Sequence, residues 1–352
     1  MKTIGYAAQS ATSKLAPFHF ERRAPRATDV AIEILYCGVC HSDLHAARND
    51  WGGSVYPCVP GHEIVGRVTA IGADVTRHAV GDHVAVGCLV DSCLQCDQCH
   101  HDEEQYCRHG YTGTYNSPDR INGENTLGGY ARHIVVREAF VLRLDNRLDL
   151  ARTGPLLCAG ITSYSPLRRW NAGPGSRVGV AGLGGLGHMA VKLAAAMGAH
   201  VTVLSRTADK LADALALGAD ELLVSGDTEA MAKAANRFDL IIDTVPVKHD
   251  INPYLPLLDI DGTLVIVGQV GTLPEPSTVP MIFGRRRIAG SLIGGIAETQ
   301  EMLDFCARKN IHPDVEMIRM DQINEAFERM ERADVRYRFV IDMASLPAPQ
   351  AG

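Results

Sequence analysis

The chain has 352 residues, of which 46% are hydrophobic and 21% are charged, and its formal net charge is −7. This length and balance predict two globular domains rather than one small core or a disordered chain. The sequence contains no cluster of basic residues, so nucleic acid is not expected as a partner.

The N-terminal segment lacks the long apolar core of a signal peptide, and no apolar run reaches the roughly 18 residues of a membrane span. We therefore expect a soluble protein of the cytoplasm with no membrane partner. In a reducing compartment, its ten cysteines are expected to be metal ligands and buried thiols rather than disulfides.

Short strand-like runs, separated by glycine and proline, occupy the first third of the chain. They cover residues 29–35, 63–71, 83–86 and 131–136. Such runs predict a largely β domain with long loops.

Strand-like runs then alternate with helical patterns. The strand-like runs cover residues 177–180, 200–204, 221–224, 240–243, 263–267 and 288–293, and the helical patterns cover residues 186–199 and 210–217. This alternation predicts βαβ units and a doubly wound parallel sheet, which places the chain in the α/β class. Helical patterns at 299–308 and 321–332, a strand at 338–342 and a loose tail at 346–352 follow.

Four cysteines follow one another at short spacing in a single loop, called the four-cysteine loop below. They are Cys93, Cys96, Cys99 and Cys107. Four thiolates at this spacing can close a tetrahedron around Zn²⁺, which leaves no position for water or substrate and predicts a structural site. An iron–sulfur cluster and four free or disulfide-bonded thiols are the alternatives.

A second metal site is predicted from Cys40, His62 and Cys158, which lie in the segments GVCHSDLH, PGHE and LLCAGITSY. Two thiolates and one imidazole leave one zinc position open for a substrate oxygen, where zinc acts as a Lewis acid. Glu63 could orient this site or ligate the ion transiently; the alternative is a simple turn carboxylate. The remaining cysteines are expected to be buried core thiols, namely Cys37, Cys58, Cys88 and Cys306.

Ser42 and His45 follow Cys40 closely and predict a proton relay. A hydroxyl near the substrate oxygen can pass a proton through the cofactor ribose to an imidazole at the surface. The alternatives are a loop cap for Ser42 and an ordinary surface residue for His45.

The turn Gly182-Leu183-Gly184-Gly185-Leu186-Gly187 matches G-x-G-x-x-G between a strand-like and a helical segment. In this setting the motif predicts a dinucleotide site, in which the glycines permit the tight turn, the approach of the pyrophosphate and close packing of the helix. A tight turn without a ligand is the alternative.

The tip of the next strand predicts which dinucleotide binds. NAD sites usually carry an acid there, whereas this tip reads Ser205-Arg206-Thr207, with Lys210 one helical turn later. A cation and two hydroxyls suit a 2′-phosphate, so we predict NADP(H) rather than NAD. The alternative is a solvated basic helix start.

Taken together, these motifs resemble the zinc-containing medium-chain dehydrogenase/reductase family, in its cinnamyl alcohol dehydrogenase-like branch of NADP-dependent aldehyde reductases. The matching segments are GVCHSD, YPCVPGHEIVG, the four-cysteine loop, YNSPD, TLGGYA, PLLCAGITSYSPL, GLGGLGH and GSLIGGIAETQEML, which span nearly the whole chain. The resemblance implies a GroES-like catalytic domain (residues 1–152 and 295–352) and a Rossmann domain (153–294).

The resemblance also implies two zinc ions per chain, one catalytic on Cys40, His62 and Cys158 beside Glu63 and one structural on the four-cysteine loop. It implies cofactor contacts from Ser42, Thr162, Gly182–Gly187, Ser205–Lys210, Thr244, Gly268, Ser291 and Ile293. Homodimers are usual in this branch.

The sequence departs from the plant enzymes of lignin synthesis at Trp51, at the Ser-Arg-Thr tip, and in a loop after Cys107 that lacks their tryptophan. We therefore expect a broad reductase of aromatic and medium aliphatic aldehydes. One alternative is an NAD-dependent polyol or secondary-alcohol dehydrogenase on the same scaffold. Another is a zinc-stabilised NADP-binding sensor without catalysis.

Overall fold

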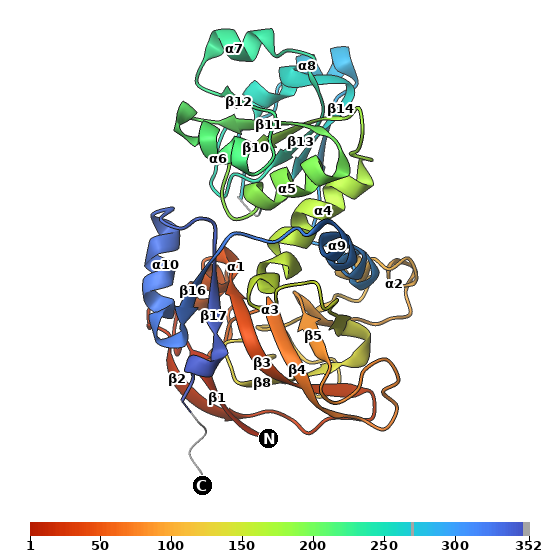
Figure 1. Cartoon of the computed structure of the whole chain (residues 1–352), viewed down its shortest axis with the longest axis vertical. Helices are drawn as coiled ribbons and strands as arrows, with labels where there is room; N and C mark the ends of the chain where they lie inside the picture. The colour runs from red at the N-terminus through yellow and green to blue at the C-terminus, as the bar shows by residue number, and fades with distance from the viewer. Residues whose placement is uncertain (269–270, 348–352) are drawn as a thin grey trace. The chain divides into compact units, whose positions relative to one another are not determined.

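The computed structural model describes residues 1–268 and 271–347 (Figure 1). The chain divides into a β-rich unit, formed by residues 1–158 and the described residues from 294 on, and a nucleotide-type unit, residues 159–293. The sequence-based limits lie at residues 152 and 294, so the observed division assigns residues 153–158 to the β-rich unit. Those residues pack on β3, β4 and β17, and they bring Cys158 into the same unit as Cys40 and His62.

The β-rich unit is built on one mixed sheet that contains strands from both ends of the chain. Its order is β16 (Val315–Arg319), β17 (Arg338–Asp342), β3 (Asp29–Val39), β4 (Ile64–Ile71), β5 (His83–Val86) and β9 (Leu142–Arg143), and β8 (His133–Arg137) also pairs with β3. The long strand β3 is mostly buried and joins β17 to β4 in antiparallel pairing. The predicted β-rich domain is therefore confirmed, and its sheet includes the C-terminal strand.

Two small antiparallel strand pairs and several helices complete this unit. The pairs are β1 (Lys2–Ala7) with β2 (Ala16–Glu21), and β6 (Leu89–Asp91) with β7 (Thr112–Gly113). The helices are α1 (His41–Arg48), α2 (Asp97–His100), α3 (Leu150–Thr153), α9 (Ile296–Lys309) and α10 (Ile323–Glu331). Single 3-10 turns cover Glu104–Tyr106, Glu138–Phe140, Gly154–Leu157, Met320–Gln322 and Met343–Ser345.

The nucleotide-type unit has a six-stranded parallel sheet. Its order is β12 (Glu221–Val224), β11 (His200–Ser205), β10 (Arg177–Ala181), β13 (Phe238–Asp243), β14 (Leu258–Ile266) and β15 (Arg287–Gly290). Within this unit, β10 is the first strand in the sequence. The chain then adds β11 and β12 on one side of β10, and β13, β14 and β15 on the other, so the direction of the strand order reverses between β10 and β13. Dinucleotides bind at the carboxyl ends of the strands at such a switch point. The predicted doubly wound parallel sheet is confirmed.

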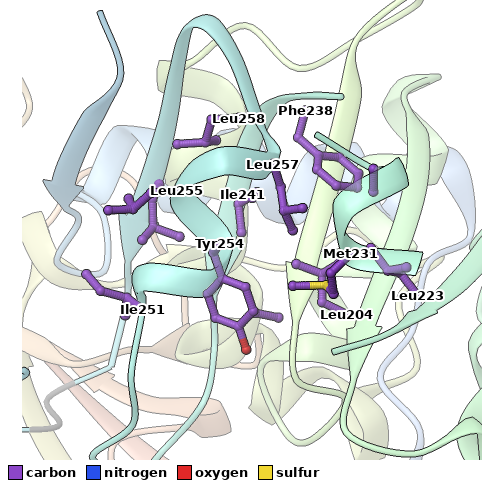
Figure 2. Packing of buried hydrophobic residues seen from close by; sticks show 13 residues of the cluster. Leu204, Leu223, Met231, Phe238, Ile241, Ile251, Tyr254, Leu255, Leu257 and Leu258 are labelled. Carbon is purple, nitrogen blue, oxygen red and sulfur yellow. The ribbon is translucent and has the colours of Figure 1, made fainter. Parts of the chain in front are cut away.

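The first helix of this unit precedes its strands, and the later helices connect them. They are α4 (Ala159–Arg169), α5 (Gly187–Met197), α6 (Leu211–Ala216), α7 (Thr228–Lys233) and α8 (Thr278–Gly284), with 3-10 turns at Ala208–Lys210 and Asn252–Leu257. Figure 2 shows one side of the core, where Phe238, Ile241 and Leu257 pack together. This packing secures β13, whose carboxyl end lies at the switch point.

The predicted loose tail is wrong at its first residue. Leu346 is 3% exposed, and Arg132 donates hydrogen bonds to the carbonyl oxygens of Leu346 and Pro347. The rest of that tail lies outside the described residues. Among the described helices, none combines the length and the apolar character that crossing a membrane requires.

Candidate active site

Four side chains that the sequence assigns to the open metal site lie together in the β-rich unit. Cys40 caps α1, His62 and Glu63 precede β4, and Cys158 follows the turn Gly154–Leu157. Their ligand atoms all lie within 4.8 Å of one another, and all four residues are buried. The Sγ atoms of Cys40 and Cys158 are 3.7 Å apart. Two thiolates on one tetrahedral zinc ion, at Zn–S bonds of about 2.3 Å, lie about 3.8 Å apart, so these residues fit the ion.

The carboxylate of Asp43 holds the ligands in place, a role that no motif argument above predicts. Its Oδ2 accepts hydrogen bonds from the Cys40 amide at 2.9 Å and from the Tyr130 hydroxyl at 2.9 Å. Its Oδ1 accepts from the Gly61 amide at 3.0 Å and lies 3.0 Å from His62 Nδ1. Because Nδ1 is engaged, Nε2 is the nitrogen of His62 that is left to bind a metal. The only sequence signal for Asp43 is its place three residues after Cys40.

Glu63 lies between the candidate metal ligands and a buried arginine. Its side chain is fully buried, and Oε1 accepts a hydrogen bond from Arg338 on β17. Burial raises the pKa of Glu63 to about 7, although the charge of Arg338 acts in the opposite direction. Oε2 has no hydrogen-bond partner among the described residues. A Cβ atom at Gly38 would lie 1.9 Å from that oxygen, so glycine is required there. The free oxygen is therefore available to a cation beside it.

Electrostatics within the cluster favour a thiolate at Cys40. A hydrogen bond with Cys158 lowers the pKa of Cys40 well below its usual value, against the effect of burial. The same hydrogen bond raises the pKa of Cys158. Burial alone would lower the pKa of His62, but the charge of Asp43 raises it well above its usual value. A buried cluster that concentrates negative charge on donor atoms suits a metal cation.

The predicted relay residues both lie on α1. Ser42 Oγ is 3.6 Å from Cys40 Sγ, which places the hydroxyl at the metal ligands. His45 Nδ1 is 2.7 Å from Asp50 Oδ2, and its ring centroid is 5.1 Å from that of Trp51. Within the described residues, no hydrogen bond joins Ser42 to His45, so a relay between them needs a further group. Asp50, which the motif analysis does not assign, fixes the orientation of the imidazole.

Cys88 is a third thiol beside the cluster. Its Sγ lies 3.6 Å from the carbonyl oxygen of Leu157, the residue before Cys158, and a hydrogen bond with Cys158 lowers its pKa. Cys88 is partly exposed, so the prediction of a buried core thiol is wrong for this residue. The same prediction is confirmed for Cys37, Cys58 and Cys306.

The four-cysteine loop gathers its thiols around one point. The four Sγ atoms lie within 4.8 Å of one another, with Cys93 and Cys99 3.8 Å apart and Cys96 and Cys99 3.5 Å apart. Hydrogen bonds from the backbone of Cys99 and Arg108 lower the pKa of Cys96 to about 6. Four sulfurs this close fit one tetrahedral ion, whereas an iron–sulfur cluster needs room for several iron and sulfide ions between them.

The glycine-rich turn connects β10 to α5 in the nucleotide-type unit. Gly182 has φ +89°, in the left-handed region, and a Cβ at Gly187 would lie 2.2 Å from the Gly182 carbonyl oxygen. By contrast, a Cβ at Gly184 would meet nothing within 4 Å, so the backbone there is open to a ligand. Thr244 Oγ1 donates a hydrogen bond to the Ala181 carbonyl oxygen at 2.8 Å and thereby supports the turn.

The basic tip lies next to this turn. Ser205 ends β11 and is buried, whereas Arg206, Thr207 and Lys210 are exposed. Lys210 Nζ donates a hydrogen bond to the Leu183 carbonyl oxygen at 3.5 Å. Arg206 and Lys210 follow β11, and the glycine-rich turn follows the neighbouring strand β10. The two cations and the turn therefore lie at the same edge of the parallel sheet.

The other predicted cofactor residues occupy the same unit except Ser42. Thr162 is buried on α4, where the neighbouring Ser163 donates a hydrogen bond to the Leu186 carbonyl oxygen at 3.2 Å. Gly268 follows β14, and Ser291 and Ile293 follow β15. The residues after β14 and β15 thus lie at the carboxyl ends of parallel strands, the edge at which dinucleotides bind.

Two family models match the chain. Residues 26–146 match the alcohol dehydrogenase GroES-like domain, and residues 185–308 match the zinc-binding dehydrogenase model. Aldehyde reductase YahK of Escherichia coli K12 is 55% identical over 348 residues, which covers 98% of this chain and 99% of that protein. The chain belongs to the zinc-containing alcohol dehydrogenase family.

Further relatives place this alcohol dehydrogenase in the cinnamyl alcohol dehydrogenase-like branch. NADP-dependent alcohol dehydrogenase C 1 of Mycolicibacterium smegmatis is 54% identical and covers 98% of this chain and 99% of its own. The cinnamyl alcohol dehydrogenase SbCAD4 of Sorghum bicolor superimposes with a TM-score of 0.96 at 45% identity, covering 100% of both chains. The cinnamyl alcohol dehydrogenase of Helicobacter pylori, solved with NADP(H), gives 0.91 at 41%, covering 98% and 99%. The protein is therefore an oxidoreductase of alcohols and aldehydes.

Proposed function

We propose that this alcohol dehydrogenase uses zinc and NADP(H) to interconvert primary alcohols and aldehydes, and that it reduces a broad range of aromatic and medium aliphatic aldehydes. The observation that carries the proposal is the buried set Cys40, His62 and Cys158, whose donor atoms fit one ion and leave a fourth position free. Zinc bound there supplies a Lewis acid that polarises the substrate oxygen.

The side chains around this set orient the zinc ligands and transfer the proton of the reaction. Asp43 fixes the ring of His62 and the backbone of Cys40, so both donors keep their direction during turnover. Ser42 Oγ, beside Cys40 Sγ, is the group placed to give a proton to the substrate oxygen. His45, held through Nδ1 by Asp50, would exchange that proton with solvent through Nε2, with the cofactor ribose as the group that joins it to Ser42.

The proposed preference for NADP(H) rests on the basic tip. Arg206 and Lys210 supply positive charge beside the Gly182–Gly187 turn, and β11 ends without an acid. Asp209 lies nearby, but its carboxylate accepts a hydrogen bond from Thr207. NADP also appears in the names of the mycobacterial relative and of the Helicobacter structure. A higher kcat/KM with NADH than with NADPH would refute this preference.

We propose two zinc ions per chain, the second of them structural and held by the four-cysteine loop. The expected zinc content is about two ions per wild-type chain and about one in Cys158→Ala, which should also lose NADPH oxidation with benzaldehyde. Cys306→Ala, a buried thiol of the β-rich unit outside both sites, is the control. Unchanged zinc and activity in Cys158→Ala would make Cys158 a core thiol. Because both sites need reduced thiols, we also propose a cytoplasmic location.

The proposed substrate range rests on Trp51, a residue that is 45% exposed and whose ring centroid lies 5.1 Å from that of His45. An apolar aromatic surface favours aromatic and aliphatic aldehydes over polyols. A substrate panel in which activity is confined to polyols or to hydroxycinnamyl compounds would refute the range. The first outcome would support the polyol dehydrogenase alternative.

We propose a homodimer formed at β15, the edge strand of the parallel sheet. An unpaired edge can pair with the same strand of a second copy about a two-fold axis. Apolar side chains gather on the adjacent α8, where Phe283 is 87% and Ile282 72% exposed. Light scattering should find a dimer for wild type and a monomer for Phe283→Glu. Val80→Glu, at an exposed apolar position in the other unit, should stay dimeric.

A further inference from the structure

A histidine and an aspartate lie in contact at the carboxyl end of β13. Asp243 is the last residue of that strand and its side chain is 1% exposed, whereas His249 lies in the connection that follows and is 16% exposed. His249 Nε2 is 3.0 Å from Asp243 Oδ2. Neither atom has a hydrogen-bond partner among the described residues. The ion pair with His249 is therefore what compensates the charge of a buried carboxylate oxygen.

The surroundings of the imidazole indicate that this pair holds a proton. His249 Nδ1 is 2.8 Å from the Val247 carbonyl oxygen, which can only accept, so Nδ1 carries a hydrogen. In a neutral ring, Nε2 then has a lone pair, which would face the carboxylate oxygen of Asp243. Attraction between these two atoms requires a proton on Nε2. Burial raises the pKa of Asp243 and the charge of His249 lowers it, so an imidazolium stabilises this carboxylate.

The other titratable groups around the pair leave His249 as the one that changes charge near neutral pH. Tyr254 lies on the 3-10 turn before β14, and its ring centroid is 6.2 Å from that of His249. Burial and the charge of Asp243 raise the pKa of Tyr254 to about 12, so its hydroxyl stays neutral, and Figure 2 shows its ring among the core side chains. Asp250 accepts a hydrogen bond from the backbone two residues later, and Lys248 is exposed.

The residues between Asp243 and His249 pack on the glycine-rich turn. A Cβ atom at Gly182 would lie 3.1 Å from Thr244 Oγ1 and 3.5 Å from a methyl carbon of Val245. Asp243 Oδ1 accepts a hydrogen bond from the Val245 amide at 3.1 Å. One carboxylate oxygen of Asp243 thus holds the start of this segment, and the other holds its end at His249.

We infer that the ion pair of Asp243 and His249 positions residues 244–249 against the glycine-rich turn, so that NADPH binds more weakly once His249 has lost its proton. The inference rests on the proposed NADP(H) function. With a neutral imidazole, the segment loses the contact at its end, and cofactor binding must then supply the cost of ordering it. NADPH affinity is therefore full where His249 is protonated and falls as the pH rises. His249 is a positioning residue, because it acts through the segment and not on the reacting atoms.

The dissociation constant of NADPH, measured from the change in its fluorescence on binding, tests the inference through Asp243→Asn. The amide NH₂ of asparagine can donate to the lone pair of a neutral imidazole but repels an imidazolium. Relative to wild type at the same pH, Asp243→Asn should bind NADPH more weakly at about pH 6 than at about pH 9, with a change in this ratio of about fivefold or more. The ratio cancels the titration of the cofactor phosphates. A role in folding alone would not make the ratio depend on pH in this direction.

His249→Ala removes the imidazole and serves as the second variant. At about pH 6 it should bind NADPH about fivefold or more weakly than wild type, and its KM for NADPH should change more than its kcat. His200→Ala is the matched control, because His200 Nδ1 is 3.1 Å from Asp220 Oδ2 in an exposed pair at the opposite end of the sheet, where β11 begins. It should keep wild-type affinity. Circular dichroism checks folding, and if His249→Ala is unfolded, the ratios for Asp243→Asn decide.

Two outcomes would overturn the inference. One is a ratio between Asp243→Asn and wild type that is the same at both pH values, and the other is wild-type affinity in folded His249→Ala. The proposed cofactor preference fails separately, if wild type binds NADH more tightly than NADPH; the same ratios measured with NADH would then still test the ion pair. A wild type that binds neither nucleotide would refute both.

Discussion

Replacement of Asp43 by asparagine keeps the size of the side chain but removes its charge and half of its acceptor positions. Each carboxylate oxygen of Asp43 accepts from two groups: Oδ2 from the Cys40 amide and the Tyr130 hydroxyl, and Oδ1 from the Gly61 amide and His62. In either orientation, the asparagine NH₂ group faces one backbone N–H. At least one buried donor then loses its partner, at a cost of about 1–3 kcal/mol.

The same change acts on zinc affinity through His62. Partners that hold a metal-bound histidine contribute about 10- to 100-fold to metal affinity. We therefore expect the zinc dissociation constant of Asp43→Asn to rise by about that factor, with kcat falling as zinc is lost. Competition with a chromogenic chelator measures the affinity, and urea unfolding measures the stability.

Asp82→Asn is the matched control, because Asp82 accepts a hydrogen bond from the Ala79 amide in an exposed turn. It should keep wild-type zinc affinity. If Asp43→Asn also bound zinc as wild type does, with unchanged free energy of unfolding, the assignment of Asp43 as the group that orients the ligands would be wrong.

Three further outcomes are expected. Gly187→Ala should lose about 1–3 kcal/mol of stability, because its Cβ would meet the Gly182 carbonyl oxygen at 2.2 Å. Gly184→Ala should unfold like wild type but have a higher KM for NADPH, because a Cβ there meets no protein atom within 4 Å. Equal free energies of unfolding for the two variants would contradict this packing. Burial raises the pKa of Cys58 and Cys306 to about 12, so their thiolate fraction at pH 8 is lower by about 1000-fold than at a pKa of 9, and mass spectrometry after brief iodoacetamide treatment should find both unlabelled. Chelation of structural zinc should make the four-cysteine loop the first site of tryptic cleavage. Earlier cleavage at another site would argue against a zinc ion that stabilises this loop.

Local spacing explains most of what could be predicted. The four-cysteine loop and the Gly182–Gly187 turn each lie within one short segment, so their geometry follows from the order of residues. Cys40, His62 and Cys158 required the further information in their flanking motifs. Thr244 was placed at the cofactor by resemblance alone, and its hydroxyl proves to be bound to the Ala181 carbonyl oxygen. Whether Thr244 also contacts the cofactor stays a prediction.

Some parts of the site could not be predicted, because they depend on pairing between distant strands. Arg338 reaches Glu63 across 275 positions of the chain, since β17 lies beside β3, and β3 beside β4. Its only signal is one charged residue at the start of the strand RFVID. Cys88 was predicted to be a core thiol, but the segment after β5 places its Sγ 3.6 Å from the carbonyl oxygen of Leu157, the residue before Cys158.

By itself, the sequence determined the two kinds of domain, the residue types of both candidate metal sites and the glycine turn. These features depend on residue identity, on periodicity and on short spacings, all of which are visible in the order of the residues alone. Only the tertiary structure decided which groups surround those residues: Asp43 behind His62, Arg338 against Glu63, and Cys88 against the carbonyl oxygen of Leu157, the residue before Cys158. The reason is that burial and hydrogen bonding join side chains by distance in space, which strand pairing establishes and sequence separation does not reveal.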